Sequence, residues 1–233
     1  MTRSPIIIAL DYPNLDNALE LVDQLDPAQC RLQVGKELFT REGPAVIRAL
    51  HDREFQVFLD LKFHDIPNTV AKACSVAADM GVWMMNVHAS GGLKMMEEAL
   101  RAVEQSGSGS LLIAVTVLTS MEASEFRSIG WDGSAEDQVK RLATLAQTAG
   151  LHGVVCSAQE APMLRQHCNS GFLLVTPGIR PPDAAKDDQK RTATPAEAVA
   201  MGVNYMVIGR PITQSVYPAK TLGEILKSVS FIQ

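Results

Sequence analysis

Residues 58–67 read FLDLKFHDIP, and this stretch holds the pattern that decides the fold. It begins as an apolar run of the kind that forms a buried β-strand. It ends in Asp65-Ile66-Pro67, where Pro67 suits the first turn of a helix and Asp65 suits a position just before one. The stretch therefore predicts a strand at 56–61 that leads through a short loop into a helix at 68–80.

A strand followed by a helix recurs along the whole chain of 233 residues. The expected strands are 6–10, 31–35, 56–61, 83–87, 111–117, 153–156, 172–176 and 205–208. The expected helices are 15–25, 43–51, 68–80, 93–104, 136–149, 162–167, 195–200 and 222–229. Eight such units in a chain of this length predict an α/β fold of the (β/α)₈ TIM-barrel type. A doubly wound open sheet is the alternative, but it usually has fewer strands, and no GxGxxG motif follows the first strand.

No linker or low-complexity stretch divides the sequence, so we expect a single domain over residues 1–233. The one long irregular segment, at about 177–194, contains three prolines, a glycine and mixed charges. Irregular segments of that length in compact domains often form lids over a site. We therefore expect a lid loop there.

The composition excludes several classes of protein. Lys and Arg number 21 and Asp and Glu 26, so the formal net charge is 21 − 26 = −5, which argues against nucleic acid as a partner. The apolar runs are far shorter than the roughly 18 residues of a membrane helix, and the N-terminus lacks a signal-peptide pattern, so we expect a cytoplasmic protein without a membrane span. The four cysteines form no CxxC pair, and we expect reduced, mostly buried thiols.

The third strand carries two charges. Asp60 and Lys62 are two apart and so share one face of the strand. The apolar residues around them take the opposite face, toward the helices, so the charged face looks into the barrel mouth, where TIM-barrel chemistry sits. Burying two charges is costly unless they are paired, so an ion pair that only plugs the barrel is the alternative to a catalytic role. For Asp65, the alternative is a cap on the following helix.

The end of the eighth strand carries Gly209 and Arg210. A glycine there lets the backbone approach a ligand, and an arginine with the N–H groups of a short helix suits a phosphate. The alternative is a turn with a solvated arginine.

His64 and His88 form no tight ligand cluster, so we expect no metal. The remaining polar residues at expected strand ends are Asp11, Gln33, Lys36, Asn86, Ser90, Thr116, Thr119, Ser157, Thr176 and Arg180.

The stretch DLKFHDIPNT at 60–69 resembles the D-x-K-x-x-D signature of orotidine 5′-monophosphate decarboxylases, in the form found in the bacterial branch. Further matching motifs occur in the same order over nearly the whole chain. They lie at 9–11, 34–37, 86–92, 115–120, 154–157, 175–181 and 207–211. Such a series of motifs in order is very unlikely to arise by chance.

The resemblance implies a lyase of pyrimidine (UMP) biosynthesis that converts orotidine monophosphate to UMP and CO₂ with no cofactor or metal. It makes Lys62 the proton donor to C6 of the pyrimidine, with Asp60 beside the departing carboxylate. It also implies a homodimer with shared active sites, in which each subunit reaches into its neighbour's site with Asp65, Ile66 and Thr69. The other substrate contacts that it implies are Asp11 on the ribose, Thr119 near the pyrimidine, Arg180 and Gln189 from the lid, and Gly209 and Arg210 on the phosphate.

One position departs from the family pattern, which has a lysine two residues before the glycine that follows the second strand. This chain has Gln33 there. We expect Gln33 to point into the barrel mouth beside Asp60, where it can bind Asp60 or a ribose hydroxyl but supplies no positive charge. The alternating Lys-Asp-Lys-Asp array of the family is then one cation short. Lys36 is a poor substitute, because strand alternation points it to the other face.

Two alternative functions follow from these residues. A metal-dependent sugar-phosphate decarboxylase or epimerase of the same barrel type shares the D-x-K-x-x-D motif, although Arg180 and Gln189 on the lid favour a nucleotide base. The glutamine at position 33 motivates the second alternative, a phosphoribosyl-binding barrel whose catalysis is weakened or lost.

Overall fold

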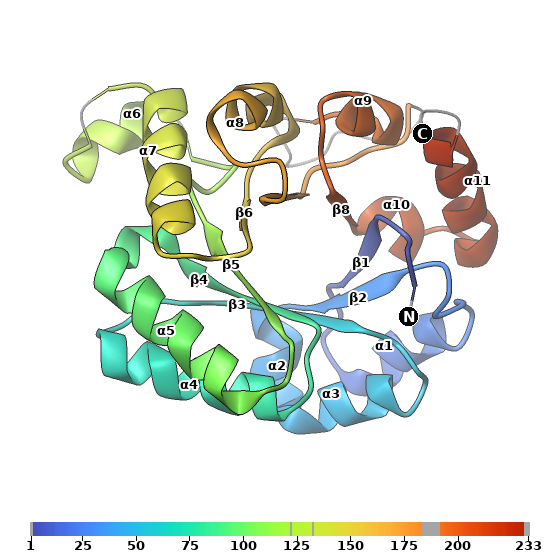
Figure 1. The fold of residues 1–233 in the computed structure, drawn as a ribbon. Helices are drawn as coiled ribbons and strands as arrows, with labels where there is room; N and C mark the ends of the chain where they lie inside the picture. Colours follow the sequence, from blue (N-terminus) through green and yellow to red (C-terminus); the bar gives the residue numbers. More distant parts are fainter. Residues whose placement is uncertain (1, 122, 132, 183–191, 231–233) are drawn as a thin grey trace.

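Eight parallel strands close into a barrel in chain order, and helices lie around its outside (Figure 1). The computed structural model describes residues 2–121, 123–131, 133–182 and 192–230. The strands are β1 (Ile6–Leu10), β2 (Arg31–Val34), β3 (Val57–Phe63), β4 (Met84–His88), β5 (Leu111–Val115), β6 (Gly153–Val155), β7 (Leu173–Thr176) and β8 (Tyr205–Ile208). The barrel closes because β1 pairs with both β2 and β8. The prediction of a (β/α)₈ TIM barrel is confirmed.

Helices lie between successive strands, and the last two follow β8. They are α1 (Leu15–Val22), α2 (Lys36–Glu42), α3 (Pro44–His51), α4 (Pro67–Asp79), α5 (Leu93–Ser106), α6 (Ala123–Ser128), α7 (Ala135–Thr148), α8 (Ala161–His167), α9 (Pro195–Ala200), α10 (Arg210–Thr213) and α11 (Pro218–Ser230). Short 3₁₀ helices, η1 (Ala89–Gly91) and η2 (Ala158–Glu160), follow β4 and β6. The helices α2 and α6, which have seven and six residues, were not expected from the sequence.

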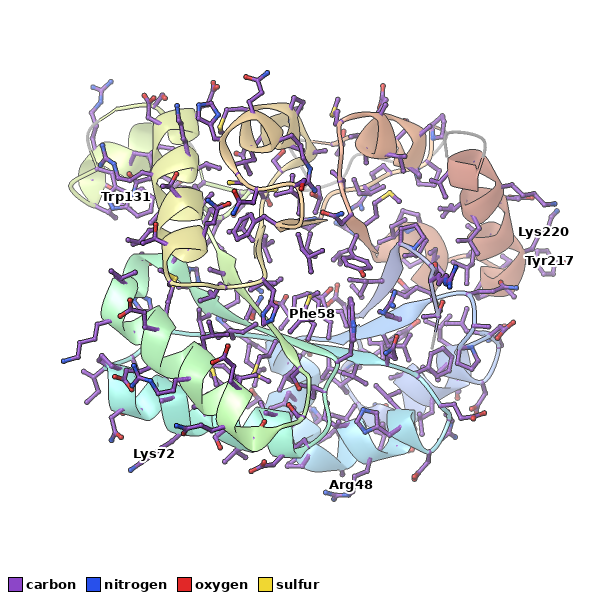
Figure 2. All side chains as sticks on the ribbon, in the orientation of Figure 1. Arg48, Phe58, Lys72, Trp131, Tyr217 and Lys220 are labelled. Atoms are coloured by element: carbon purple, nitrogen blue, oxygen red, sulfur yellow. The ribbon has the colours of Figure 1, made fainter. Side chains whose placement is uncertain are left out.

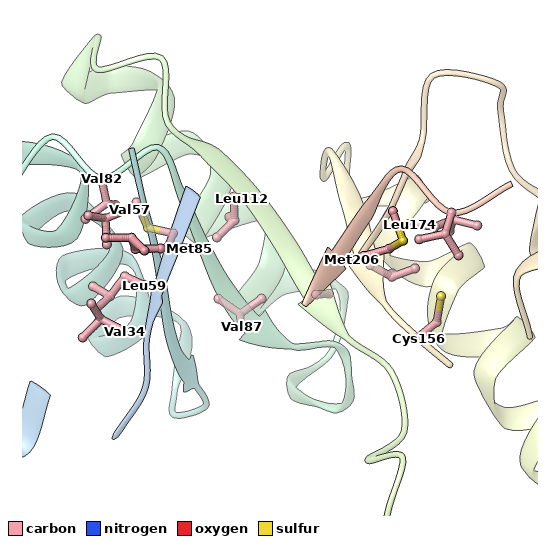
Figure 3. Close-up of a cluster of buried hydrophobic side chains, with 14 of the residues drawn as sticks. Val34, Val57, Leu59, Val82, Met85, Val87, Leu112, Cys156, Leu174 and Met206 are labelled. Carbon is pink, nitrogen blue, oxygen red and sulfur yellow. The ribbon is translucent and has the colours of Figure 1, made fainter. Parts of the chain in front are cut away.

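The strand residues alternate between two cores, so both faces of each strand are buried. Outward-facing side chains pack against the helices, and Figure 3 shows this arrangement for Val34, Leu59 and Val87 on neighbouring strands. Inward-facing side chains fill the barrel. They are Ile7, Ala9, Phe58, Met84, Ile113, Val175 and Val207. Burial on both faces explains why the strands read as nearly continuous apolar runs.

Figure 2 shows the same division between inside and outside. Phe58 lies toward the middle of the molecule, whereas Arg48, Lys72 and Lys220 extend outward from helices at its edge. Phe58 is 1% exposed, so the barrel interior is a packed core and not a channel.

Arg31, the first residue of β2, occupies the N-terminal end of the barrel. Its guanidinium donates hydrogen bonds to the carbonyl oxygens of Thr2 and Ser4, at 2.7 and 2.6 Å, and to Gln56 Oε1 at 3.0 Å. It also lies 4.1 Å from the centre of the Trp83 ring. These contacts satisfy the buried charge, and they give this end of the barrel a structural role.

The cysteines follow the expectation from their sequence spacing. Cys30, Cys74 and Cys156 are buried, Cys168 is half-buried, and all four are free thiols. Burial raises the pKa of each of the three buried thiols to about 12, so they are unreactive at neutral pH.

Two further expectations concern the membrane and the lid. In the described part of the chain, no helix has the length and apolar character that crossing a membrane requires. The two ends of the expected lid segment lie together, because Ile179 pairs with Ala193 and the Arg180 N–H donates to the Ala193 carbonyl at 2.9 Å. The middle of that segment, residues 183–191, falls outside the described residues.

Candidate active site

Polar side chains from β2, β3 and β4 meet above the inner core. Gln33 is paired with Phe58, and Phe58 with Met84, across the three strands. Asp60 and Asn86 lie two residues beyond Phe58 and Met84, and alternation along a strand directs them to the same inward face. The mouth of the barrel therefore receives Gln33, Asp60 and Asn86 together.

Asp60 is the centre of this group, and only 7% of it is exposed. The ammonium Nζ of Lys62 lies 2.7 Å from Asp60 Oδ2. Asn86 Nδ2 donates to Asp60 Oδ1 at 2.6 Å, and Gln33 Nε2 donates to Oδ2. The Lys62 side chain keeps 25% of its surface exposed, so the ion pair is accessible from the mouth.

Gln33 lies beside Asp60, as the strand order predicted, and gives it a neutral hydrogen-bond donor. The other end of the Gln33 amide is less well placed, because its Oε1 is buried without a hydrogen-bond partner. Leaving a buried acceptor unsatisfied costs about 1–3 kcal/mol. A lysine at this position has no acceptor atom to leave unsatisfied.

The ends of β1 and β8 extend the site. A Cβ atom added to Gly209 would lie 3.7 Å from Asp11 Oδ2, so these two residues are neighbours. Asp11 is exposed at the mouth, yet the protein around its carboxylate removes part of its hydration and raises its pKa. The charge of Asp60 raises that pKa further, and the Arg210 guanidinium opposes the rise. Asp11 is therefore within electrostatic reach of both Asp60 and Arg210.

The placement of Lys36 corrects one prediction. β2 ends at Val34 and Lys36 is the first residue of α2, so strand alternation does not set the direction of the Lys36 side chain, contrary to the prediction. The positive charge of Lys36 acts on His88 at the end of β4. The pKa of His88 is lowered to about 4, chiefly by burial, then by His64, whose ring centre is 5.6 Å away, and by Lys36. His88 is therefore neutral at pH 7, and Lys36 lies near the edge of the site.

Asp65, Ile66 and Thr69 are exposed, in contrast to Asp60, and Ile66 is 65% exposed. The alternative reading of Asp65 as the cap of α4 is wrong, because the N-cap residue is Ile66. The Asp65 carboxylate instead accepts a hydrogen bond from the Ile66 N–H at 2.6 Å.

The substrate contacts predicted after β5 and β7 differ in how far they are buried and in whether the structure describes them. Thr119 is half-buried in the turn after β5. Arg180 is buried, and its Nη1 donates to the Ile179 carbonyl at 3.0 Å. Gln189 falls outside the described residues.

Other polar residues at strand ends serve local structure. Thr116 Oγ1 donates to the Val155 carbonyl at 3.0 Å, and Ser157 forms a reciprocal cap with Glu160 at the start of η2. Among the residues with described positions, no three or more His, Cys, Asp or Glu side chains gather into a group that could hold a metal ion.

The site combines the Lys62 ammonium, which the Asp60 carboxylate holds, with a second cation, Arg210, near Asp11. Lys62 can donate a proton to a substrate atom above Asp60. Arg210, whose charge acts on Asp11, suits an anionic group of the same substrate. Asn86 could be read from the sequence only as a polar residue at a strand end, and its contacts with the Asp60–Lys62 pair come from the folded structure.

Comparison with known proteins places the chain among its relatives. A sequence model of the orotidine 5′-phosphate decarboxylase / HUMPS family matches residues 4–225. Orotidine 5′-phosphate decarboxylase from Nitrosococcus oceani is 60% identical over 230 residues, which cover 99% of each chain. The protein of that name from Alcanivorax borkumensis is 58% identical over 97% of this chain and 98% of its own.

Solved structures show the same relationship. The crystal structure of orotidine 5′-phosphate decarboxylase from Lactobacillus acidophilus superposes with a TM-score of 0.87 at 35% identity, covering 97% of this chain and 99% of the other. Since the family motifs, the fold and the sequence identity agree over nearly the whole length, the chain belongs to the orotidine 5′-phosphate decarboxylase / HUMPS family.

Proposed function

We propose that this protein decarboxylates orotidine 5′-monophosphate to UMP and CO₂ without a cofactor. The observation that carries the proposal is the Asp60–Lys62 ion pair, 2.7 Å long, which is accessible from the barrel mouth. Relatives that bear the name of this enzyme are 57–60% identical to the chain over nearly its full length. Among the described residues, no group of metal ligands favours the metal-dependent alternative. Gln33 is the one described residue that favours the non-catalytic alternative.

In this reaction the bond between C6 and the carboxylate carbon breaks, and its electron pair stays on C6. The difficulty is that no neighbouring group can delocalise this charge. An ammonium fixed beside C6 stabilises the developing negative charge and then supplies the proton that forms the C6–H bond. Lys62 is the proposed donor, and Asp60 holds its ammonium in place through a 2.7 Å contact. Water then returns a proton to Lys62.

The proposed phosphate subsite is Gly209 with Arg210, and Asp11 would bind the ribose. This assignment is supported by the proximity of Gly209 to Asp11 and by the electrostatic influence of Arg210 on the same carboxylate. A phosphate bound far from C6 contributes binding energy that orients the pyrimidine over Lys62.

The proposed pyrimidine contacts are Thr119, Arg180 and Gln189. Arg180 belongs to the lid segment, whose described ends are joined at Ile179 and Ala193. A lid that closes over the pyrimidine excludes water, and a dry site strengthens the interaction between the ammonium and the developing charge.

A second copy of the chain is proposed to complete each site with Asp65, Ile66 and Thr69. The exposure of all three side chains supports this assignment, since Ile66 is a large apolar residue with 65% of its surface open. A homodimer would bury that surface, and Asp65 would bring a carboxylate to the partner's Lys62.

The test is the loss of orotidine monophosphate absorbance in the presence of the purified protein. We expect turnover that a metal chelator leaves unchanged. No turnover would overturn the proposed function, and loss of turnover with the chelator would favour the metal-dependent alternative.

The Lys62→Ala variant tests the residue assigned to the chemistry. We expect turnover to fall by roughly 10²- to 10⁴-fold or more, the usual contribution of a positioned proton donor, while UMP still binds through the phosphate subsite. Turnover within about tenfold of the parent would refute the role of Lys62 as the proton donor.

A further inference from the structure

Asn86, in β4, touches both members of the Asp60–Lys62 pair. The Asn86 side chain is completely buried. Its Nδ2 donates to Asp60 Oδ1 at 2.6 Å, and its Oδ1 accepts from the backbone N–H of Lys62 at 2.8 Å. Chemistry fixes this orientation of the amide, because an ionised carboxylate only accepts hydrogen bonds and a backbone N–H only donates them.

The contact with the Lys62 backbone compensates for a break in the sheet. Leu59 pairs with Met85 and Phe63 pairs with Val87, so three residues of β3 between these pairs face the single residue Asn86 of β4. Such a mismatch is a bulge, which interrupts the backbone ladder and redirects side chains. The Asn86 side chain accepts the Lys62 N–H in place of a neighbouring backbone carbonyl.

The same bulge holds Lys62 in an uncommon backbone conformation. Its φ is +54°, in the left-handed region that residues with a side chain rarely adopt. Backbone strain of this kind persists only where the surroundings enforce it, and it is concentrated at functional sites. The Asn86 hydrogen bond acts directly on the strained residue and so helps to enforce its conformation.

We infer that Asn86 is a positioning residue for the reaction of Lys62. It fixes the Asp60 carboxylate with one half of its amide and the Lys62 backbone with the other, so that the ammonium is held in the barrel mouth. Gln33 differs from Asn86, since its described hydrogen bond reaches Asp60 alone. The inference rests on the proposed function for its effect on turnover, but its effect on the Lys62 backbone is independent of any substrate.

Two variants distinguish the hydrogen bond of Asn86 to Asp60 from its hydrogen bond to the Lys62 backbone. Asn86→Leu has a similar volume and removes both hydrogen bonds. Asn86→Asp keeps an acceptor for the Lys62 N–H and replaces the donor to Asp60 with a second carboxylate. We expect kcat to fall at least about thirtyfold in both, with the UMP dissociation constant within about threefold of the parent, because the phosphate subsite is untouched.

Ser110→Ala is the matched control for loss of a buried hydrogen bond. Ser110 is buried just before β5, at the opposite end of the barrel, and its Oγ donates to the Val82 carbonyl at 2.6 Å. We expect this variant to lose thermal stability while its kcat stays within about threefold of the parent. If Asn86→Leu loses stability but retains kcat in the same way, Asn86 is only structural and the inference is overturned.

Amide hydrogen exchange of Lys62 provides the readout that needs no substrate. We expect slow exchange in the parent and in Asn86→Asp, and faster exchange in Asn86→Leu. Fast exchange of this amide in the parent would overturn the inference even if neither variant folds. A parent that does not turn over orotidine monophosphate but shows this exchange pattern would refute the proposed function and support the positioning of Lys62 by Asn86.

Discussion

Gln33 donates a hydrogen bond from a neutral amide to the Asp60 carboxylate, at the position where we expect a lysine from the family resemblance. A hydrogen bond with one charged partner contributes roughly 1.5–3 kcal/mol, and a lysine would add the attraction between two opposite charges. The glutamine also leaves its buried Oε1 unsatisfied. We therefore expect Gln33→Lys to raise kcat/KM by roughly tenfold or more, since about 1.4 kcal/mol corresponds to a factor of ten.

The measurement is steady-state decarboxylation of both proteins at the same pH and salt. Gln33→Met serves as the control, because it has a similar length but neither donor nor charge, and we expect it to be slower than the parent. If Gln33→Lys is no faster than the parent, another cation already compensates Asp60. Lys36 is then the residue to replace next, since its charge reaches His88 in the same mouth.

His88 links the site to the pH dependence of stability. Burial, His64 and Lys36 lower its pKa from the ordinary value near 6.5 to about 4 in the folded chain. Between these two values the unfolded state binds more protons at this position, so the free energy of unfolding falls as the pH falls. The stability that His88 contributes as a neutral, buried group is fully present above about pH 6.5 and is lost as the pH approaches about 4.

We expect His88→Gln to show a weaker loss of stability than the parent between pH 7 and about 4, because glutamine does not titrate. The measurement is urea unfolding of both proteins at several pH values, compared as the difference between them. That comparison cancels the contribution of Asp11, whose raised pKa acts in the opposite direction. Parallel curves for the two proteins would contradict the assignment to His88.

At the scale of elements, β6 and β7 approach closely at a glycine. A Cβ atom on Gly153 would lie 2.2 Å from the Leu173 carbonyl oxygen, which is backbone and has little freedom to move. We expect Gly153→Ala to lower the free energy of unfolding by about 1–3 kcal/mol, the usual cost of overpacking. For a chain of this length, each kcal/mol lowers the melting temperature by roughly 2–4 °C.

A glycine-to-alanine substitution in α11 is the control, and we expect it to change the free energy of unfolding in the opposite direction. Gly223 has no neighbouring atom within 4 Å of an added Cβ and lies inside the helix. We expect Gly223→Ala to raise the free energy of unfolding by about 0.5–1 kcal/mol, because alanine loses less backbone entropy than glycine. Equal melting temperatures for the two variants would show that the strands can separate at Gly153 at no cost.

At the scale of the whole molecule, the proposed shared site makes a prediction about mixed dimers. Lys62→Ala and Asp65→Ala chains are each expected to be inactive alone. When the two are mixed, each heterodimer contains one site with both residues intact and one site with neither, so activity should reappear. Activity is measured after denaturation and joint refolding, with each chain refolded alone as the control. Proven heterodimers that remain inactive would show that Asp65 does not act across an interface.

The sequence alone determined the architecture, because that information is local and repeated. Eight apolar runs, each followed by a helical pattern, predicted the closed barrel that the structure has. Alternation along β3 predicted that Asp60 and Lys62 share a face, and strand order predicted that Gln33 lies beside them. These predictions succeeded because they needed only the period of a strand and the adjacency of consecutive strands.

Only the tertiary structure decided how the charged residues are held. The bulge in β3, the left-handed backbone of Lys62 and the two hydrogen bonds of Asn86 depend on the register between two strands, which no local pattern specifies. Lys36 was misplaced for a different reason, because strand alternation was carried past Val34, where β2 ends, into α2. The lowered pKa of His88 likewise depends on burial and on charges from α2 and β3, which are distant in the sequence and come together only in the closed barrel.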